Sequence, residues 1–272
     1  MILLFQLVIS LVLTTLYAFN ISVQLEIIDI FKVILVFFGL NIAITLLVLL
    51  IFVSLIYLTS KSAPNSIKKH KMFNYYNHYI FNFLFRVKPI VIGKENLPKD
   101  NNFVVYSNHV EYTDPFYIKQ VYKDYPLAFI AKEELFKIPL IKTIIKSIGC
   151  IPLSRKVGDR QALQAVLQAI NQVKNGQPIA IFPAGTRTHS NSMNEFKPGA
   201  FKTAQKAKAD ISLIVLYNFH KTVETFKIFK AKIYLKVLPL IKYEEYKDLD
   251  TIGISDLVYA KIKDELETFK EI

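Results

Sequence analysis

The sequence predicts an α/β domain with a mostly parallel central sheet flanked by helices, preceded by an N-terminal hydrophobic helical membrane anchor. Two observations predict this architecture. Long uncharged apolar runs are confined to the first 58 residues, and beyond residue 85 short β-branched runs alternate with helical periodicity. The 52% apolar content of the 272 residues exceeds that of an average soluble domain. We therefore divide the chain into residues 1–64, the membrane-anchoring helices, and residues 65–272, the α/β domain.

The anchor is predicted from two runs without charged side chains, residues 1–24 and residues 33–58. As a helix rising about 1.5 Å per residue, the second run exceeds the roughly 30 Å hydrocarbon thickness of a bilayer. The first run has neither a basic segment at its start nor a small-residue cleavage site, which favours a short first span over a signal peptide. The two runs are expected to form a two-span hairpin.

Charge around the runs predicts the orientation. The link between them carries two acids and one lysine, whereas four lysines follow the second run: Lys61, Lys68, Lys69 and Lys71. By the positive-inside rule, everything after Leu58 is expected on the cytoplasmic face of the cell membrane. The single cysteine, Cys150, excludes an intramolecular disulfide and fits a reducing compartment.

The chain is strongly basic, with a formal net charge of +12. A basic domain tethered beside a bilayer most simply faces anionic lipid headgroups or anionic substrates. Nucleic acid is the other kind of partner that a basic domain suits. No zinc-finger spacing or recognition motif occurs, so we expect a membrane lipid bilayer as a partner and no nucleic acid.

The segment at residues 62–87 mixes lysines with a dense set of aromatic residues and includes His70. Cationic and aromatic side chains together suit a helix in the membrane interface. An ordinary amphipathic helix packed on the domain explains the same pattern, and both interpretations stay open.

The remaining elements follow from their periodicity. We predict strands over residues 89–93, 103–107, 127–131, 150–153, 178–182, 212–217 and 231–241. We predict helices over residues 114–123, 138–148, 158–176, 198–209 and 254–272. Strands that alternate with helices in this way indicate a parallel sheet.

Polar residues follow several of these strands at the point where each strand ends. His109, Lys132 and Arg155 each come after one strand, and the sequence PAGTR, residues 183–187, comes after another. Because parallel strands end at the same edge of a sheet, we expect these side chains at one edge, where α/β sheets bind their ligands.

His109 and Asp114 lie on either side of one predicted turn. A histidine can take up a proton near neutral pH when one ring nitrogen is free and an acceptor such as Asp114 holds the other. Two alternatives compete with this interpretation: Asp114 could simply cap a helix that has Pro115 at its first position, and His109 could be structural. The sequence contains no G-x-S-x-G motif, so we expect the nucleophile to be a hydroxyl of the substrate.

Several motifs resemble those of one enzyme family. NHVEYTD resembles the N-H-x-x-x-x-D signature of the glycerolipid acyltransferases, and FPAGTR is similar to their F-P-E-G-T-R block. AKEELFKIP, GCIPLSR and FKPGAFKTA match further blocks, in the order and spacing of the family over roughly residues 85–220. The specific resemblance is to bacterial 1-acylglycerol-3-phosphate acyltransferases.

The resemblance implies a membrane-bound acyltransferase of phospholipid biosynthesis with the glycerolipid acyltransferase fold. It implies that His109 deprotonates the sn-2 hydroxyl of lysophosphatidate while Asp114 orients His109. The alkoxide would attack the thioester of acyl-CoA or acyl carrier protein and give phosphatidate. The thioester is a co-substrate, and neither a cofactor nor a metal is expected.

The resemblance also implies a site for the phosphate of the substrate. Lys132 and Arg187 match basic residues of the family that hold this phosphate, and Gly185 and Thr186 shape the loop around it. Arg155 is a plausible third contact. The two cations suit a phosphate because arginine offers a planar fork and lysine a point charge.

Two positions depart from the family pattern. Ala184 stands where the family has a glutamate, and Leu216 stands where the family has a proline in a later strand. The departures leave two alternatives open. One is a different acceptor, such as glycerol 3-phosphate or a lyso-lipid without phosphate, and the other is a non-catalytic lipid-binding relative. His189, two residues after Arg187, is a weaker candidate for substrate contact.

Overall fold

The computed structural model describes residues 2–19, 27–59, 61–84, 87–154, 160–224 and 230–269. The chain divides into two compact units, Met1–Leu58 and Thr59–Ile272.

The first unit consists of two apolar helices, α1 (Ile2–Phe19) and α2 (Ile27–Thr59). The Gln6 side-chain amide donates to the Asn41 carbonyl oxygen and to Thr45 Oγ1, both at 2.9 Å, so polar contacts join the two helices. Within the described residues one helix, Ile27–Leu58, is long and apolar enough to cross a membrane, and the apolar helix Gln6–Phe19 is shorter. The two-span hairpin therefore stays a prediction.

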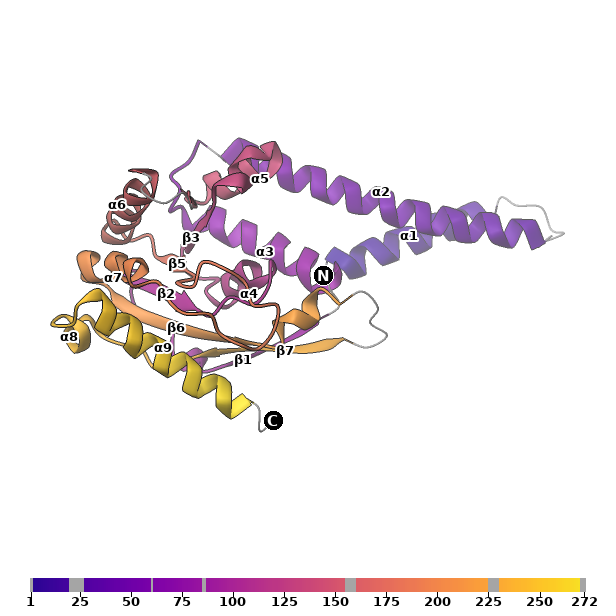
Figure 1. The fold of residues 1–272 in the computed structure, drawn as a ribbon. Coiled ribbons are helices and arrows are strands. Elements are labelled where there is room, and N and C mark those ends of the chain that lie inside the picture. Colours follow the sequence, from indigo (N-terminus) through magenta and orange to yellow (C-terminus); the bar gives the residue numbers. More distant parts are fainter. Residues whose placement is uncertain are drawn as a thin grey trace. The chain divides into compact units, whose positions relative to one another are not determined.

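The second unit is built on a seven-stranded sheet in the described part of the chain (Figure 1). Its strands are β1 (Val87–Ile92), β2 (Phe103–Ser107), β3 (Ala128–Lys132), β4 (Ile151–Leu153), β5 (Ile179–Ile181), β6 (Asp210–Tyr217) and β7 (Ala231–Val237). The order across the sheet is β1-β7-β6-β2-β5-β3-β4, and the pairs are parallel except β6 with β7. The predicted mostly parallel sheet is confirmed.

The last strand is shorter than the sequence predicts. It ends at Val237 rather than at residue 241. Pro239 has no backbone N–H to donate to a neighbouring strand, and beyond it only an isolated bridge between Ile241 and Ile211 remains.

One face of the sheet is covered by α6 (Arg160–Lys174), α7 (Lys202–Ala207) and α9 (Thr251–Thr268). Val104 and Leu213 of the central strands belong to one core cluster with residues of these helices, among them Ala204 and Val258. All four side chains are fully buried. The predicted helix 198–209 is divided into a 3₁₀ turn, η3 (Pro198–Phe201), and α7.

The opposite face is covered by α4 (Asp114–Val121), with α3 (Ile67–Leu84) packed on it. Side chains alternate across a strand, so Phe103 and Ser212 point away from the α9 side. Tyr122, just after α4, stacks on Phe103 at 5.9 Å between ring centroids and bonds Ser212 through its hydroxyl. The other elements are η1 (Lys94–Asn96), η2 (Glu133–Lys137), α5 (Pro139–Ser147), η4 (Phe219–Thr222) and α8 (Tyr243–Tyr246).

Helix α3 falls in the segment with two open interpretations. Asn77 donates to the Phe116 carbonyl oxygen at 2.7 Å, and Phe81 stacks on Phe116 at 3.7 Å between centroids. His70 is fully buried. One face of α3 therefore packs on the α/β domain, as the second interpretation expects. Membrane contact by the exposed face, which carries Tyr75, stays a prediction.

Candidate active site

The turn after β2 is fixed to the neighbouring strand β6 by Asn108. Its side-chain amide donates to the Leu216 carbonyl oxygen at 2.8 Å and accepts from the Leu216 N–H at 2.9 Å. A proline at position 216 would have no N–H to donate. Leu216, which departs from the family pattern, therefore makes a bond to Asn108 that the family proline cannot make. Asn108 was not among the predicted site residues, because this pairing spans 108 positions of sequence.

His109 and Asp114 are brought into direct contact. His109 Nδ1 lies 2.8 Å from Asp114 Oδ2, and the same oxygen accepts from the backbone N–H groups of Val110 at 2.6 Å and Glu111 at 2.9 Å. Burial raises the pKa of the Asp114 carboxyl, and the bonds from His109 and the backbone oppose that shift. Three donors therefore converge on a carboxylate that has no exposure to solvent.

The helix-cap interpretation of Asp114 is not what the structure shows. Asp114 is the first residue of α4, and Thr113 is its N-cap. The Asp114 oxygens bond residues that precede the helix rather than the N–H groups of its first turn. This carboxylate orders the turn and the imidazole.

The His109 ring is held on one face and at one nitrogen. It stacks on Phe182 with 4.0 Å between centroids and 18° between planes. Its side chain keeps 17% of its exposure, and no hydrogen bond to Nε2 occurs in the described residues. An imidazole fixed at Nδ1 in a partly exposed ring whose Nε2 makes no hydrogen bond in the described residues has the arrangement of a general base.

The loop after β5 carries the PAGTR sequence next to His109. The Thr188 N–H donates to the His109 carbonyl oxygen at 3.0 Å, and the His189 N–H donates to the Val110 carbonyl oxygen at 3.1 Å. The Arg187 guanidinium lies 3.3 Å from the centroid of the Tyr112 ring, a cation–π contact. The predicted phosphate-binding arginine and the predicted base thus lie on two loops that are bonded to each other.

The loop has a sharp turn at Gly185. Its φ of +73° is in the left-handed region, which suits glycine, and a β-carbon there would lie 3.7 Å from Lys197 Nζ. The Lys197 N–H donates to the Pro183 carbonyl oxygen at 3.1 Å, so this lysine is a further cation at the loop, which the sequence prediction missed. Thr186 is exposed and accepts from the Asn194 side chain at 3.1 Å.

The structure describes one of the other two predicted cations, Lys132, and not the other, Arg155. Lys132 ends β3, which pairs with β5 in parallel, and its Nζ lies 3.2 Å from Glu134 Oε1 with the side chain 47% exposed. Lys132 thus lies at the predicted edge of the sheet, although no interaction in the described residues joins it to His109 or Arg187. Arg155 lies outside the described residues.

A second imidazole and carboxylate pair lies beside the first. His189 Nδ1 is 2.6 Å from Glu111 Oε1, and the Glu111 side chain is only 3% exposed. Glu111 was missed because its position inside the motif has no fixed residue type. Ala184, at the position of the family glutamate, is 5% exposed and packs in the hydrophobic core.

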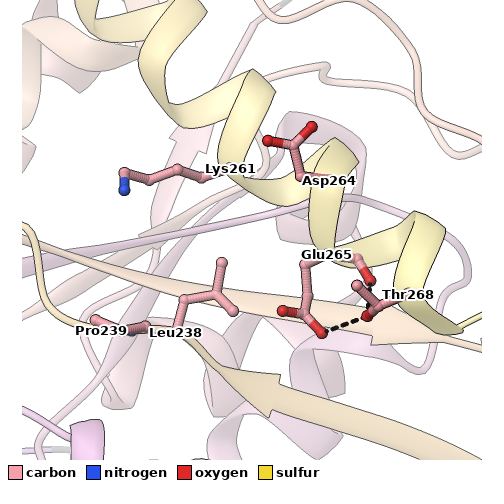
Figure 2. Close-up of a pocket in the computed structure, with 6 residues that line it drawn as sticks. All are labelled: Leu238, Pro239, Lys261, Asp264, Glu265 and Thr268. Atoms are coloured by element: carbon pink, nitrogen blue, oxygen red, sulfur yellow. Dashed lines mark hydrogen bonds between the residues drawn. The ribbon is translucent and has the colours of Figure 1, made fainter.

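A pocket of about 300 Å³ lies elsewhere, between α9 and the residues that follow β7 (Figure 2). It is lined by Leu238, Pro239, Lys261, Asp264, Glu265 and Thr268. None of the predicted site residues lines it. We therefore place the candidate site at His109 and not here.

Comparison with known proteins agrees with the motifs. The acyltransferase family model matches residues 88–217. A 1-acyl-sn-glycerol-3-phosphate acyltransferase of Borreliella burgdorferi is 31% identical over 186 residues, which are 68% of this chain and 74% of that protein. The enzyme of that name from Bacillus subtilis is 31% identical over 143 residues, which are 53% of this chain and 69% of that protein. The match to the Chlamydomonas reinhardtii relative, at 35% identity, covers 47% of this chain and 38% of that protein.

The fold has a counterpart among solved structures. The crystal structure of the 1-acyl-sn-glycerophosphate acyltransferase from Thermotoga maritima superposes with a TM-score of 0.65 at 24% identity, covering 80% of this chain and 88% of that one. This likeness concerns the fold alone. The sequence matches confirm the predicted family. The chain belongs to the acyltransferase family, among the 1-acyl-sn-glycerol-3-phosphate acyltransferases.

Proposed function

We propose that this chain transfers a fatty acyl group from a thioester to the sn-2 hydroxyl of 1-acylglycerol 3-phosphate and so forms phosphatidate. One observation carries the proposal. An imidazole oriented by a buried carboxylate lies on a loop that is hydrogen-bonded to the loop of a cation suited to phosphate. An acceptor with a hydroxyl and a phosphate on neighbouring carbons matches this pair of groups.

The reaction needs no acyl-enzyme. His109 Nε2 takes the proton of the acceptor hydroxyl while its oxygen attacks the thioester carbonyl carbon. The tetrahedral intermediate collapses, the C–S bond breaks, and the leaving thiolate takes the proton from His109. Asp114 holds the reactive tautomer and stabilises the imidazolium between the two proton transfers.

Arg187 is the phosphate ligand that we propose first. One of its nitrogens, Nη1, is buried without a hydrogen-bond partner in the described residues, which suits a group that completes its bonds with substrate. Lys132, Lys197 and Arg155 are proposed as further cations. Gly185 and Thr186 shape the loop through the left-handed turn and the contact with Asn194.

The proposal includes a place in the cell. Helix α2 is long and apolar enough to anchor the chain in the cytoplasmic membrane, with the catalytic unit on the cytoplasmic face. Lys71 is an exposed position on α3, so a Lys71→Cys variant without Cys150 should resist an impermeant thiol reagent in intact cells and react after lysis. Ready labelling in intact cells would contradict the orientation.

The activity is tested with the purified protein and labelled donors. We expect acylation of lysophosphatidate with acyl-CoA or acyl carrier protein as the thioester, without added cofactor, and the assay of both donors identifies the one used. Preference for glycerol 3-phosphate or a phosphate-free lyso-lipid would favour the alternative acceptor. Binding of lysophosphatidate without any turnover would instead favour a non-catalytic relative.

A further inference from the structure

Two short segments meet at the candidate site, residues 109–112 after β2 and residues 187–189 after β5. Two backbone hydrogen bonds join them, from Thr188 to His109 and from His189 to Val110. The side chains add the Glu111 to His189 pair at 2.6 Å and the Arg187 to Tyr112 contact at 3.3 Å. Every residue of 187–189 therefore contacts the segment that carries His109.

Among these contacts, the pair of Glu111 and His189 is the one that involves a buried charge. The Glu111 carboxylate is 3% exposed, so water does not compensate its desolvation, and His189 Nδ1 is its side-chain partner in the described residues. A buried carboxylate that loses its hydrogen-bond partner is left uncompensated. The position of the His189 ring is therefore tied to Glu111.

The backbone at His189 shows that the loop is held rather than relaxed. Its φ of 55° lies in the left-handed region, which is uncommon for residues other than glycine, although histidine, like asparagine and aspartate, adopts it more often than most. The bond from its N–H to Val110 and the bond from its ring to Glu111 are the two contacts that can offset this conformation. Arg187 lies two residues earlier on the same constrained segment.

The segment of residues 183–189 has no carboxylate of its own to make such a contact. Residues 183–187 contain no acid, and Ala184 is buried in the apolar core. The carboxylate that restrains the loop comes instead from Glu111, 78 positions earlier than His189.

We infer that Glu111 and His189 are positioning residues that hold the Arg187 loop at a fixed separation from His109. The pair thereby selects an acceptor whose phosphate and reacting hydroxyl have the matching separation. This inference rests on the proposed function, because it assumes a phosphate-bearing acceptor at Arg187. Neither residue needs to touch the substrate for this role.

A set of variants at the two positions tests the inference by steady-state kinetics, with the acceptor and the thioester varied separately. His189→Ala removes the imidazole and keeps an unfavourable φ, so the KM for lysophosphatidate should rise about tenfold, and the KM for the thioester should not change. His189→Asn places an amide N–H near the position of Nδ1 and tolerates the left-handed backbone, so it should restore the acceptor KM to within about threefold. Glu265→Gln is the matched control, because it alters an ion pair of the same 2.6 Å length with Lys236, between α9 and β7.

The double variant separates positioning from general destabilisation. His189→Ala alone leaves the Glu111 carboxylate without its partner, whereas the double variant of Glu111→Ala and His189→Ala removes both groups. The acceptor KM of the double variant should therefore not exceed that of His189→Ala. If His189→Ala does not fold, Glu111→Ala and the double variant carry the same test. Additive losses, or an equal rise in both KM values, would overturn the positioning role while acylation of lysophosphatidate by the wild type leaves the proposed function intact. A wild type that does not acylate lysophosphatidate would overturn both.

Discussion

Two histidines, His109 and His70, contact the same short helix, α4, and differ in their partners, their exposure and the number of ring nitrogens that are bonded. His109 pairs with Asp114 at the start of α4, and its ring keeps 17% exposure with Nε2 unbonded in the described residues. His70 pairs with Lys119 later in α4, 2.6 Å from Nζ, and is fully buried. Its second nitrogen lies 2.8 Å from the Pro64 carbonyl oxygen. A histidine with both nitrogens occupied has none to offer a substrate, so we expect His109 to be the reactive imidazole and His70 to be structural.

The two histidines also have partners of opposite charge type, a carboxyl group for His109 and an amine for His70. Burial lowers the pKa of His70 to about 3, and the nearby charge of Lys119 adds to that shift. Burial likewise lowers the pKa of Lys119 to about 7 and raises the pKa of the Cys150 thiol to about 11. The His70 region therefore avoids charge in the core, whereas the partner of His109 Nδ1 is the carboxyl group of Asp114. Partner charge, rather than burial alone, distinguishes the two sites.

Removing each imidazole should separate activity from stability. His109→Ala should lower kcat/KM of the folded protein by about 10²- to 10⁴-fold, since it deletes a general base, and should lower the thermal unfolding midpoint modestly, because buried Asp114 loses one of its three donors. His70→Ala should lower the unfolding midpoint, because it leaves the Pro64 carbonyl and Lys119 without their partner, and should keep kcat in the folded fraction. Both variants are compared by initial rates and thermal unfolding in the same detergent. Full activity of His109→Ala would remove the distinction between the two histidines.

The Lys119 cluster predicts a pH dependence of stability. The folded pKa of Lys119, about 7, lies below the value of about 10.4 for an unfolded lysine, so between these pH values the unfolded state binds more protons. The free energy of unfolding should therefore rise from pH 7 toward pH 10, by an amount on the order of 4 kcal/mol. Lys119→Met removes this group and should flatten the rise, measured as unfolding midpoints of both proteins across the range. Parallel curves for the wild type and the variant would contradict a buried, easily deprotonated Lys119.

The smallest effect is expected at the phosphate site. Arg187→Lys replaces a planar fork that lies on Tyr112 with a point charge, so the KM for lysophosphatidate should rise about tenfold, while kcat changes less. The measurement is a steady-state titration of acceptor at saturating thioester. An unchanged acceptor KM would mean that Arg187 does not bind the phosphate.

The sequence was sufficient to predict the parallel sheet and the edge at which the candidate site residues lie. The β-branched runs predicted the strands, and the rule that parallel strands end together placed His109, Lys132 and residues 183–187 at one edge. The contact between His109 and Asp114 was predicted as one of the interpretations of their spacing, because five positions across one turn bring the two side chains within reach, but the spacing alone did not exclude a helix cap.

The long-range pairs were not predictable. Glu111 and His189 are 78 positions apart, and Lys119 and His70 are 49 apart, so each contact depends on how whole strands and helices pack. His70 lies in a lysine-rich segment that resembles a membrane-surface helix, yet it is buried in contact with Lys119 of α4 and with the Pro64 carbonyl oxygen. Periodicity describes one element at a time and carries no information on such pairs.

The most direct test of the central claim is Asp114→Asn. Asp114 Oδ2 accepts from His109, Val110 and Glu111 alike, so an asparagine oxygen in that place keeps these bonds and the turn but removes the negative charge that stabilises the imidazolium during proton transfer. We therefore predict a folded protein, shown by circular dichroism and an unfolding midpoint near that of the wild type, with kcat/KM reduced on the order of 10²-fold or more. A folded Asp114→Asn protein with wild-type kcat/KM would contradict the oriented-base account.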